Sequence, residues 1–243
     1  MYMNQINKPT VSVIMSCFNS ENYVEQAARS IINQTFHNLE FLIMDDGSTD
    51  NTYNILNDLK SEDRRIKIFQ NTKNIGLTKS LNLLLNKANG EFIVRQDADD
   101  ISYKNRIKSQ VEILSTSNFS ACTTRAKIIG SNTKKPKYLY LFPKKLVIKF
   151  RNPFIHGTLA VKKQVLNDLG NYDEDFYFAQ DFMLFSKMIK QGYKIKYLSE
   201  VFYEINMKEN ISTNFLKQQN YYANCVKKNI KPETIKDHNL KNT

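Results

Sequence analysis

Short apolar runs alternate with amphipathic segments along the first hundred residues of the chain. Each run is rich in β-branched or aromatic side chains and is short, which is typical of a buried strand. Between the runs, apolar residues recur with the three- or four-residue spacing of one helix face. This repeated βα order predicts a mostly parallel sheet covered by helices on both faces. The predicted strands lie at 11–16, 41–44, 66–69 and 91–94.

The second half of the chain is less regular. Helical and strand-like patterns both recur, but at uneven intervals, so we expect a boundary near residue 101. From 206 to 243 the chain is polar and rich in lysine, which predicts a basic, helical tail. The predicted helices lie at 103–114, from Gln180 to a stop at Gly192, and at 215–228, and the predicted strands at 121–130, 154–161 and 193–198.

Acidic side chains follow two of the predicted strands. Asp45 and Asp46 come directly after the second strand, and Asp97, Asp99 and Asp100 follow the fourth. The carboxyl ends of parallel strands share one edge of the sheet, where ligands bind in α/β proteins. Neighbouring carboxylates repel unless something positive lies between them, and Mg²⁺ and Mn²⁺ prefer such oxygen ligands. The alternative is a solvated turn with a helix cap, which is the commoner origin of an isolated D-x-D motif.

Composition limits the class of protein. The chain has 243 residues, of which 41% are hydrophobic and 24% charged, and is long enough for a substantial core. Cys17, Cys122 and Cys225 match no zinc-binding spacing, which indicates a reducing, cytoplasmic compartment. No apolar run approaches the roughly 20 residues that span a bilayer, and the first residues lack the apolar core of a signal peptide. We therefore expect any membrane contact to be peripheral, on the inner face of the cytoplasmic membrane.

Four motifs, in order, carry a family resemblance. They read "VSVIMSCFNSENYVEQAARSIINQT", "EFLIMDDGSTDNT", "NIGLTKSLN" and "VRQDADD". Together they resemble the family-2 glycosyltransferases, which are inverting enzymes with the GT-A fold. The resemblance implies a Rossmann-like, mostly parallel α/β sheet flanked by helices. It covers a domain at 9–205, with a nucleotide-binding half at 9–100 and an irregular, acceptor-binding and catalytic half at 101–205, followed by the helical tail at 206–243.

The resemblance implies a nucleotide site in the first half. In the family, the loop after the first strand lies against the nucleotide base. Here that loop contains Ser16, Phe18 and Asn19, with Glu21 close by. The first acid of "DDGS" reaches the base, usually uracil, and in this chain it is Asp45.

The resemblance also assigns the D-x-D motif and two basic residues. Asp97 contacts the ribose, Ala98 lies at the nucleotide between the two acids, and Asp99 binds a Mn²⁺ or Mg²⁺ ion. His156 falls where the family often has a histidine near the diphosphate or acceptor, although a lone histidine beside an apolar run is equally typical of packing. Lys79 is a candidate contact of the nucleotide, although the residues around it also fit a simple turn.

Two positions depart from the family pattern. Cys17 stands where the family often has a proline, and Gln180 precedes Asp181 where the family usually has an acidic pair. Because the second acid remains, the resemblance assigns Asp181 as the general base that activates an acceptor hydroxyl. Its place at the start of a predicted helix also fits a helix cap. The metal would offset the charge of the leaving diphosphate.

Positive charge gathers away from these acids. Residues 134–151 carry seven basic and no acidic side chains, interleaved with Tyr138, Tyr140 and Phe142, and the chain has a formal net charge of +11. This mixture suits an anionic membrane, but also single-stranded nucleic acid or a solvated face. Because family members often act on lipid-linked glycans, we expect peripheral membrane contact and no nucleic acid.

The expected function is therefore the transfer of one sugar. The chain lacks tryptophan, so the Q-x-x-R-W signature of processive synthases is absent. We expect a metal-dependent transfer from a UDP-linked donor to a glycan or lipid-linked acceptor in cell-surface polysaccharide synthesis, such as lipopolysaccharide or capsule. A sugar nucleotidyltransferase is the nearest rival, but its glycine-rich phosphate loop is missing from "SCFNSEN". The other alternative is a non-catalytic module that binds membrane or nucleic acid.

Overall fold

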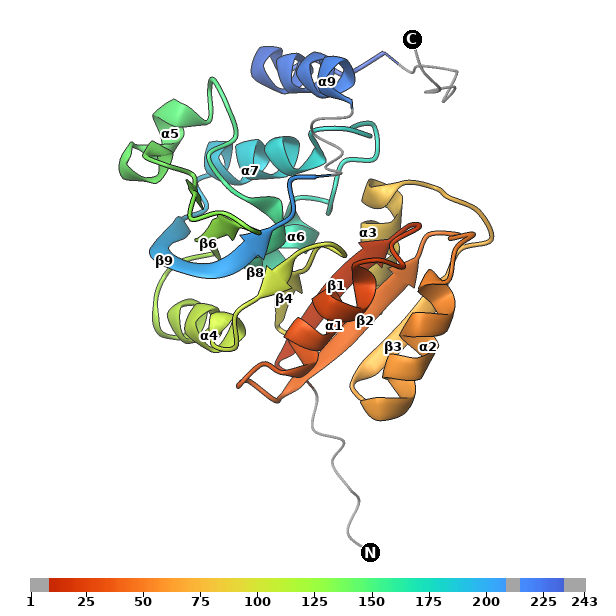
Figure 1. The fold of residues 1–243 in the computed structure, drawn as a ribbon. Helices are drawn as coiled ribbons and strands as arrows, with labels where there is room; N and C mark the ends of the chain where they lie inside the picture. Colours follow the sequence, from red (N-terminus) through yellow and green to blue (C-terminus); the bar gives the residue numbers. More distant parts are fainter. Residues whose placement is uncertain (1–8, 209–214, 234–243) are drawn as a thin grey trace, which may run out of the picture.

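A single sheet runs through the molecule (Figure 1). The computed structural model describes residues 9–208 and 215–233. Within these ranges nine strands form the sheet in the order β3-β2-β1-β4-β8-β6-β9-β5, with β7 paired to β6. Across the same ranges, no helix combines the length and the apolar character needed to cross a membrane.

The first half follows the predicted βα order, so the strands and helices predicted from the apolar pattern are confirmed. β1 pairs in parallel with β2 and β4, and β2 pairs in parallel with β3. The strands are β1 (Val11–Cys17), β2 (Leu39–Asp45), β3 (Ile66–Gln70) and β4 (Phe92–Arg95), and the helices are α1 (Val24–Ile32), α2 (Thr52–Glu62) and α3 (Leu77–Lys87).

The second half adds antiparallel pairs. β8 runs antiparallel to both β4 and β6, β9 runs parallel to β6, and β5 runs antiparallel to β9. The sheet therefore continues without a break across the expected boundary near residue 101. Its elements are β5 (Ile101–Ser102), α4 (Arg106–Thr116), β6 (Ala121–Ile128), β7 (Lys134–Lys135), η1 (Leu139–Leu141), α5 (Lys144–Val147), η2 (His156–Thr158), β8 (Ala160–Lys162), α6 (Lys163–Asp168), α7 (Gln180–Lys190) and β9 (Ile195–Ile205).

The predicted tail contains one described helix. α9 (Leu216–Lys228) lies along α7 and buries Tyr222, Cys225 and Val226 (Figure 1). The prediction of a helix at 215–228 is therefore confirmed. The other parts of the tail, 209–214 and 234–243, lie outside the described residues.

One predicted strand, at 154–161, is wrong over most of its length. The 3₁₀ turn η2 occupies its middle, and β8 begins only after that turn. The Ile155 carbonyl accepts hydrogen bonds from the Thr158 amide (3.1 Å) and the Thr158 hydroxyl (2.8 Å), which closes the turn. Gly157 lies so near the Asp97 carboxylate that a Cβ atom there would come within 2.5 Å of it. The turn thus brings backbone, rather than a side chain, against the acidic cluster.

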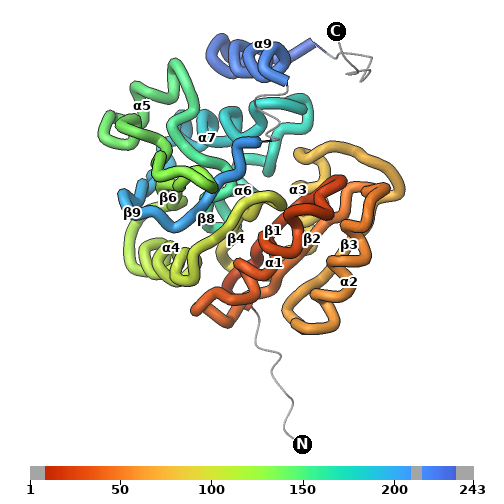
Figure 2. Tube along the Cα trace, viewed as in Figure 1, coloured from red at the N-terminus to blue at the C-terminus, as the bar shows by residue number. Residues whose placement is uncertain are grey.

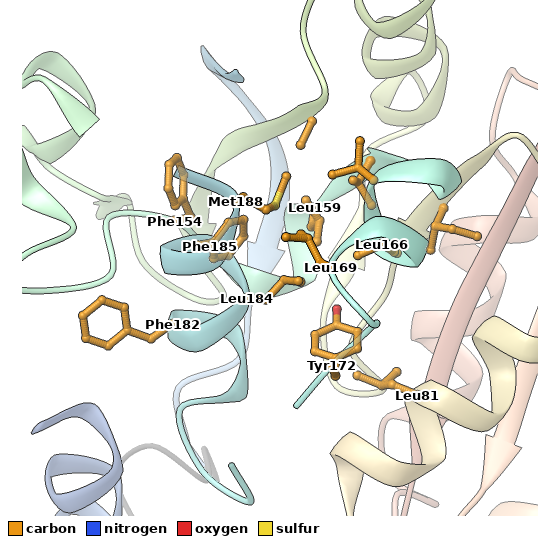
Figure 3. Close-up of a cluster of buried hydrophobic side chains, with 14 of the residues drawn as sticks. Leu81, Phe154, Leu159, Leu166, Leu169, Tyr172, Phe182, Leu184, Phe185 and Met188 are labelled. Carbon is orange, nitrogen blue, oxygen red and sulfur yellow. The ribbon is translucent and has the colours of Figure 1, made fainter. Parts of the chain in front are cut away.

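Apolar side chains pack on both faces of the sheet. Along β1, Val13 and Ile14 belong to separate clusters, because successive strand residues point to opposite faces. The cluster around Ile14 extends to α6 and α7, where Leu166, Phe185 and Met188 surround the same core (Figure 3). Both faces of the sheet are therefore held, and its strand ends form a rigid base for the loops that follow.

A buried carboxylate joins the beginnings of β1, β2 and β3 to the turn that precedes β4. Glu40, on β2, accepts hydrogen bonds from the Ser12 hydroxyl, the Asn89 amide and Lys67 Nζ, each at 2.7 Å. The Ser12 hydroxyl in turn accepts a hydrogen bond from the Gly90 amide at 2.8 Å. These contacts fix the strands relative to one another, and so fix the level at which the opposite, acidic ends stop.

Replacing Glu40 with alanine is expected to lower the free energy of unfolding by about 2–3 kcal/mol, because the buried Ser12 hydroxyl and the partly buried backbone amide of Asn89 lose their acceptor. Urea denaturation measures the change. Glu62→Ala is the control, since the Glu62 carboxylate is exposed and pairs with Arg29 at the surface, where solvent screens the pair. Equal losses in the two variants would show that the buried contacts of Glu40 contribute no more than a surface ion pair.

Candidate active site

The loop after β1 is hydrogen-bonded to the loop after β2. Asn19, which has a φ angle of +48°, accepts a hydrogen bond from the Thr49 amide at 2.9 Å. Glu21 accepts one from the Asn51 amide, also at 2.9 Å. Phe18, beside them, is an exposed aromatic ring. These bonds hold the residues of the two predicted nucleotide loops in one unit.

Asp45 ends β2 and is fully buried. In the sheet it is level with Cys17 of β1 and Gln70 of β3. Ser16, which precedes Cys17 in β1, is partly exposed. The Asp45 carboxylate accepts hydrogen bonds from Gln70 Nε2 (3.0 Å) and the Ser48 amide (3.1 Å). Burial, and then the charge of Asp45, raise the pKa of the Cys17 thiol, so this cysteine stays protonated and is not a nucleophile.

Asp46 shapes the loop before α3. It accepts hydrogen bonds from Asn71 Nδ2 (2.8 Å) and from the amides of Ile75 (3.0 Å) and Gly76 (2.9 Å). The Asp46 carboxylate therefore serves to hold this loop in place by hydrogen bonds within the protein. Lys79 is exposed in the first turns of the helix that follows, and has no ion-pair partner among the residues that the structure describes.

The acidic cluster after β4, formed by Asp97, Asp99 and Asp100, is built on a buried arginine. Arg95, the last residue of β4, is 1% exposed and forms an ion pair with Asp97. Its Nη1 atom donates to the carbonyl oxygens of Ile14 (3.0 Å) and Gln96 (2.9 Å). Because the guanidinium is held by β1 and by the chain just after β4, the position of the Asp97 carboxylate is fixed as well.

A second buried arginine lies under the same cluster. Arg106, the first residue of α4, donates to the carbonyl oxygens of Gly157 (2.7 Å) and Arg95 (2.8 Å), and its guanidinium lies 5.0 Å from the centre of the Tyr203 ring. Burial lowers the pKa of Arg106 to about 10, so it remains charged at neutral pH. No sequence motif singles out Arg106, whose one signal is a charge next to Ile107 in the apolar stripe of the predicted helix.

Tyr203 connects β9 to the acidic cluster. A bulge shifts the register between β6 and β9 just before it, which sets where its side chain points. The Tyr203 hydroxyl accepts a hydrogen bond from the Asp97 amide at 3.1 Å, and Asp100 accepts one from the Asn206 amide at 2.8 Å. Burial, and then the charges of Asp97 and Asp99, raise the pKa of Asp100 well above its usual range. Asp97 and Asp99 are thus close enough to Asp100 to disfavour its ionised form.

This cluster fits a divalent ion by its chemistry. Within the described ranges, no three His, Cys, Asp or Glu side chains form a metal cage of protein alone. Mg²⁺ and Mn²⁺ do not need one, because one or two carboxylates suffice when water and phosphate complete the shell. Asp99 is partly exposed, Ala98 before it is buried, and the mutual repulsion of the acids is the condition that a bound cation relieves.

Asp181 lies in the first turn of α7. Its Oδ2 atom accepts a hydrogen bond from Asn152 Nδ2, and its Oδ1 atom accepts one from the Phe182 amide, both at 2.7 Å. Burial raises the pKa of Asp181, and the charge of Asp97 raises it further. Asp181 and Asp97 are therefore close enough for their carboxylates to interact electrostatically. Asn152 was missed, because an asparagine in a basic, irregular segment carries no signal.

His156 belongs to the same site. Its Nε2 atom lies 2.7 Å from the Tyr172 hydroxyl oxygen. Burial, and then the charge of Arg95, lower the pKa of His156 well below its usual range, so the ring is neutral. The Tyr172 hydroxyl in turn lies in the field of Arg95, Asp97 and Asp181. Tyr172 is a further site residue that nothing in the sequence pattern singled out.

The sequence of the chain is similar to those of known glycosyltransferases. The profile of "Glycosyl transferase family 2" matches residues 12–170. An uncharacterised glycosyltransferase of Haemophilus influenzae is 30% identical over 94% of this chain and 74% of its own length. An Escherichia coli protein, UDP-Glc:alpha-D-GlcNAc-diphosphoundecaprenol beta-1,3-glucosyltransferase WfgD, is 30% identical over 75% of this chain and 70% of its own length.

Solved structures share the fold. S. aureus TarS superposes with a TM-score of 0.73 at 22% identity, over 92% of this chain and 67% of that structure. The mannosyltransferase PcManGT of Pyrobaculum calidifontis superposes with a TM-score of 0.74 at 22% identity, over 89% of this chain and 62% of that structure. These likenesses confirm the predicted GT-A fold. With the profile match and the similar relatives, they show that the chain is a glycosyltransferase and belongs to glycosyl transferase family 2.

Proposed function

We propose that this glycosyltransferase moves one sugar from a UDP-linked donor to a hydroxyl of a glycan or lipid-linked saccharide during cell-surface polysaccharide synthesis. The reaction depends on a divalent ion and inverts the anomeric carbon. The observation that supports the proposal is that one short segment contacts both acids: Asn152 donates a hydrogen bond to Asp181 at 2.7 Å, and Gly157 packs against the Asp97 carboxylate. A donor-binding acid and a base for the acceptor need this proximity.

The names of similar proteins support the choice of substrates. WfgD of E. coli is named as a UDP-Glc-dependent glucosyltransferase acting on a diphosphoundecaprenol-linked sugar. TarS has been solved with UDP-GlcNAc, and PcManGT with GDP-Man and Mn²⁺. A nucleotide sugar with a divalent ion is the feature that this proposal carries over to the present chain.

In this proposal the nucleobase of the donor lies on the joined loops after β1 and β2. The exposed ring of Phe18 offers an apolar surface for the base, while Ser16, Asn19 and Glu21 form the loop around it. Asp45, which Ser48 and Gln70 hold beneath these loops by hydrogen bonds, is assigned to the nucleobase.

The sugar and diphosphate side of the donor lies at the acidic cluster. Asp97 binds the ribose and is held for this by Arg95. His156, whose neutral ring is hydrogen-bonded to Tyr172, and Lys79 take the diphosphate side, with Ala98 as a close backbone contact. Asp99 would hold Mn²⁺ or Mg²⁺, which when bound supplies Lewis-acid charge against the leaving diphosphate.

Asp181 acts on the acceptor. It takes the proton of the acceptor hydroxyl while that oxygen forms a bond to the anomeric carbon, on the face opposite the departing diphosphate. This direct displacement inverts the configuration. A base works best when its pKa approaches the working pH, and burial with a nearby carboxylate raises the pKa of Asp181 in that direction. Asn152 opposes part of this shift, since its hydrogen bond favours the ionised carboxylate.

Asp181→Asn is expected to reduce transfer by about 10²–10⁴-fold, because the proton acceptor is removed. UDP release with acceptor present measures the rate, and titration with UDP measures donor binding, which should change by less than about two-fold because Asp181 serves the acceptor. A variant that keeps the full rate would place the base elsewhere.

The rate should also fall as the pH drops, because Asp181 must be ionised to act as a base. Since its pKa is raised, the acid limb should lie above the usual carboxyl range near about 4. Asn152→Ala removes a hydrogen bond that favours the ionised form, so it should move this limb to higher pH. Asn167→Ala, on the exposed side of α6, is the matched control and should leave the pH profile unchanged. An unmoved limb in Asn152→Ala would contradict the assignment.

UDP and Mn²⁺ together should raise the melting temperature by about 5 °C at saturating concentrations, more than the sum of their separate effects. Asp99→Asn should abolish this synergy, because the ion loses a carboxylate ligand. Asp58→Asn, on exposed α2, serves as the control. Synergy that persists in Asp99→Asn would mean that another residue holds the ion, and synergy with GDP rather than UDP would refute the choice of nucleotide.

A further inference from the structure

The segment 134–151, here called the basic–apolar segment, exposes apolar side chains to an unusual degree. It forms α5 and its flanking turns at the margin of the molecule, away from α2 and β3 (Figure 2). Among the described residues, the three most exposed large apolar side chains all belong to it. The exposed side chains and their fractions are Tyr138 (70%), Leu141 (68%), Phe150 (67%), Phe142 (55%) and Leu146 (54%).

The same segment concentrates positive charge. Its seven lysine and arginine residues are accompanied by no aspartate or glutamate. The charge extends to β9, because Lys196 lies close enough to add to the effect of burial in lowering the pKa of Lys144. Two cations held this near each other favour an anionic partner over solvent alone.

The inner side of the segment is packed, so its outer side chains project from a fixed base. The Tyr140 ring stacks on Tyr197 with 5.4 Å between ring centres, and the Arg125 guanidinium lies 5.0 Å from the centre of the Tyr140 ring. Ile148, between exposed neighbours, is buried at 7% exposure. The outward apolar side chains are therefore presented in a stable arrangement and not by a loose loop.

We propose that the basic–apolar segment docks on an anionic phospholipid bilayer, with its lysines at the headgroups and its apolar side chains entering the acyl boundary. Each basic residue near such a surface contributes about five-fold to binding, and apolar insertion adds a part that salt does not screen. A second copy of this chain is a poorer partner, because two equally positive segments repel. Single-stranded nucleic acid would use the aromatic rings for stacking but has no use for Leu141 and Leu146.

The docking surface leads directly to the acceptor side of the proposed active site. Arg151 is the last residue of the segment, and the next residue, Asn152, donates a hydrogen bond to the Asp181 carboxylate at 2.7 Å. Docking therefore brings Asp181, the proposed general base, close to the membrane surface, where a lipid-borne acceptor would present its hydroxyl. The membrane contact itself does not require transfer, whereas this consequence rests on the proposed function.

Flotation of the full chain with vesicles tests the docking surface without any sugar donor. We expect binding to vesicles of equal parts phosphatidylcholine and phosphatidylglycerol, and little binding to phosphatidylcholine alone. The double variant Lys145→Glu/Lys149→Glu should lower the bound fraction at low salt by at least about ten-fold. Lys60→Glu/Lys108→Glu makes the same charge change at exposed positions of α2 and α4 and should alter binding by less than about two-fold.

A second pair of variants tests the apolar part. Phe150→Ser should remove most of the binding that persists at high salt, and Leu83→Ser, at an exposed position of α3, should not. The proposal is overturned if the wild-type chain does not float, if both charge variants bind equally, or if the segment binds only single-stranded oligonucleotide or a second copy. Transfer to a water-soluble acceptor stays normal in Lys145→Glu/Lys149→Glu, so a failed docking surface is distinguishable from a failed enzymatic assignment.

Discussion

The ion pair between Asp97 and the buried Arg95 is the interaction on which the site depends. The buried Arg95 guanidinium would carry a large desolvation cost without a carboxylate partner, and Asp97 supplies that partner. Arg95 in turn offsets the repulsion between Asp97 and Asp100, while bound to β1 and to the chain after β4. Arg106 extends the arrangement by holding the carbonyls of Arg95 and Gly157 from α4. Because these segments come from both halves of the chain, the acidic cluster is complete only when the second half has packed against the first.

The fold of the first half could be predicted because local pattern and final burial agree. All residues of β2 are buried, as its uninterrupted apolar run indicates. At 154–161 the same kind of run has a different cause. Phe154 packs against Phe185 at 4.5 Å between ring centres and Leu159 enters the core, while the residues between them form a turn. Hydrophobicity alone does not separate a buried strand from two anchors that flank a turn.

At the site, the sequence indicated the acids but not the groups that position them. Asp97 and Asp181 are recognisable as charges at the ends of apolar elements within a family motif. Their partners come from segments with ordinary patterns: Tyr203 reaches the cluster only because of a bulge between β6 and β9, and Tyr172 only because a loop returns to His156. Bulges and loop returns are set by long-range packing, so one sequence carries no local signal for them.

β6 and β8 are adjacent antiparallel strands, and the long connection between them pairs with β6 only through the two-residue strand β7 before it returns one strand away. A connection of this kind can be lengthened, shortened or exchanged without altering the order of the other strands in the sheet. The sequence of its outer portion, 129–151, can therefore vary while the nucleotide loops, which follow β1 and β2, stay unchanged. For protein engineers, the surface that such a transferase docks on and the nucleotide it recognises then become two traits that can be changed independently.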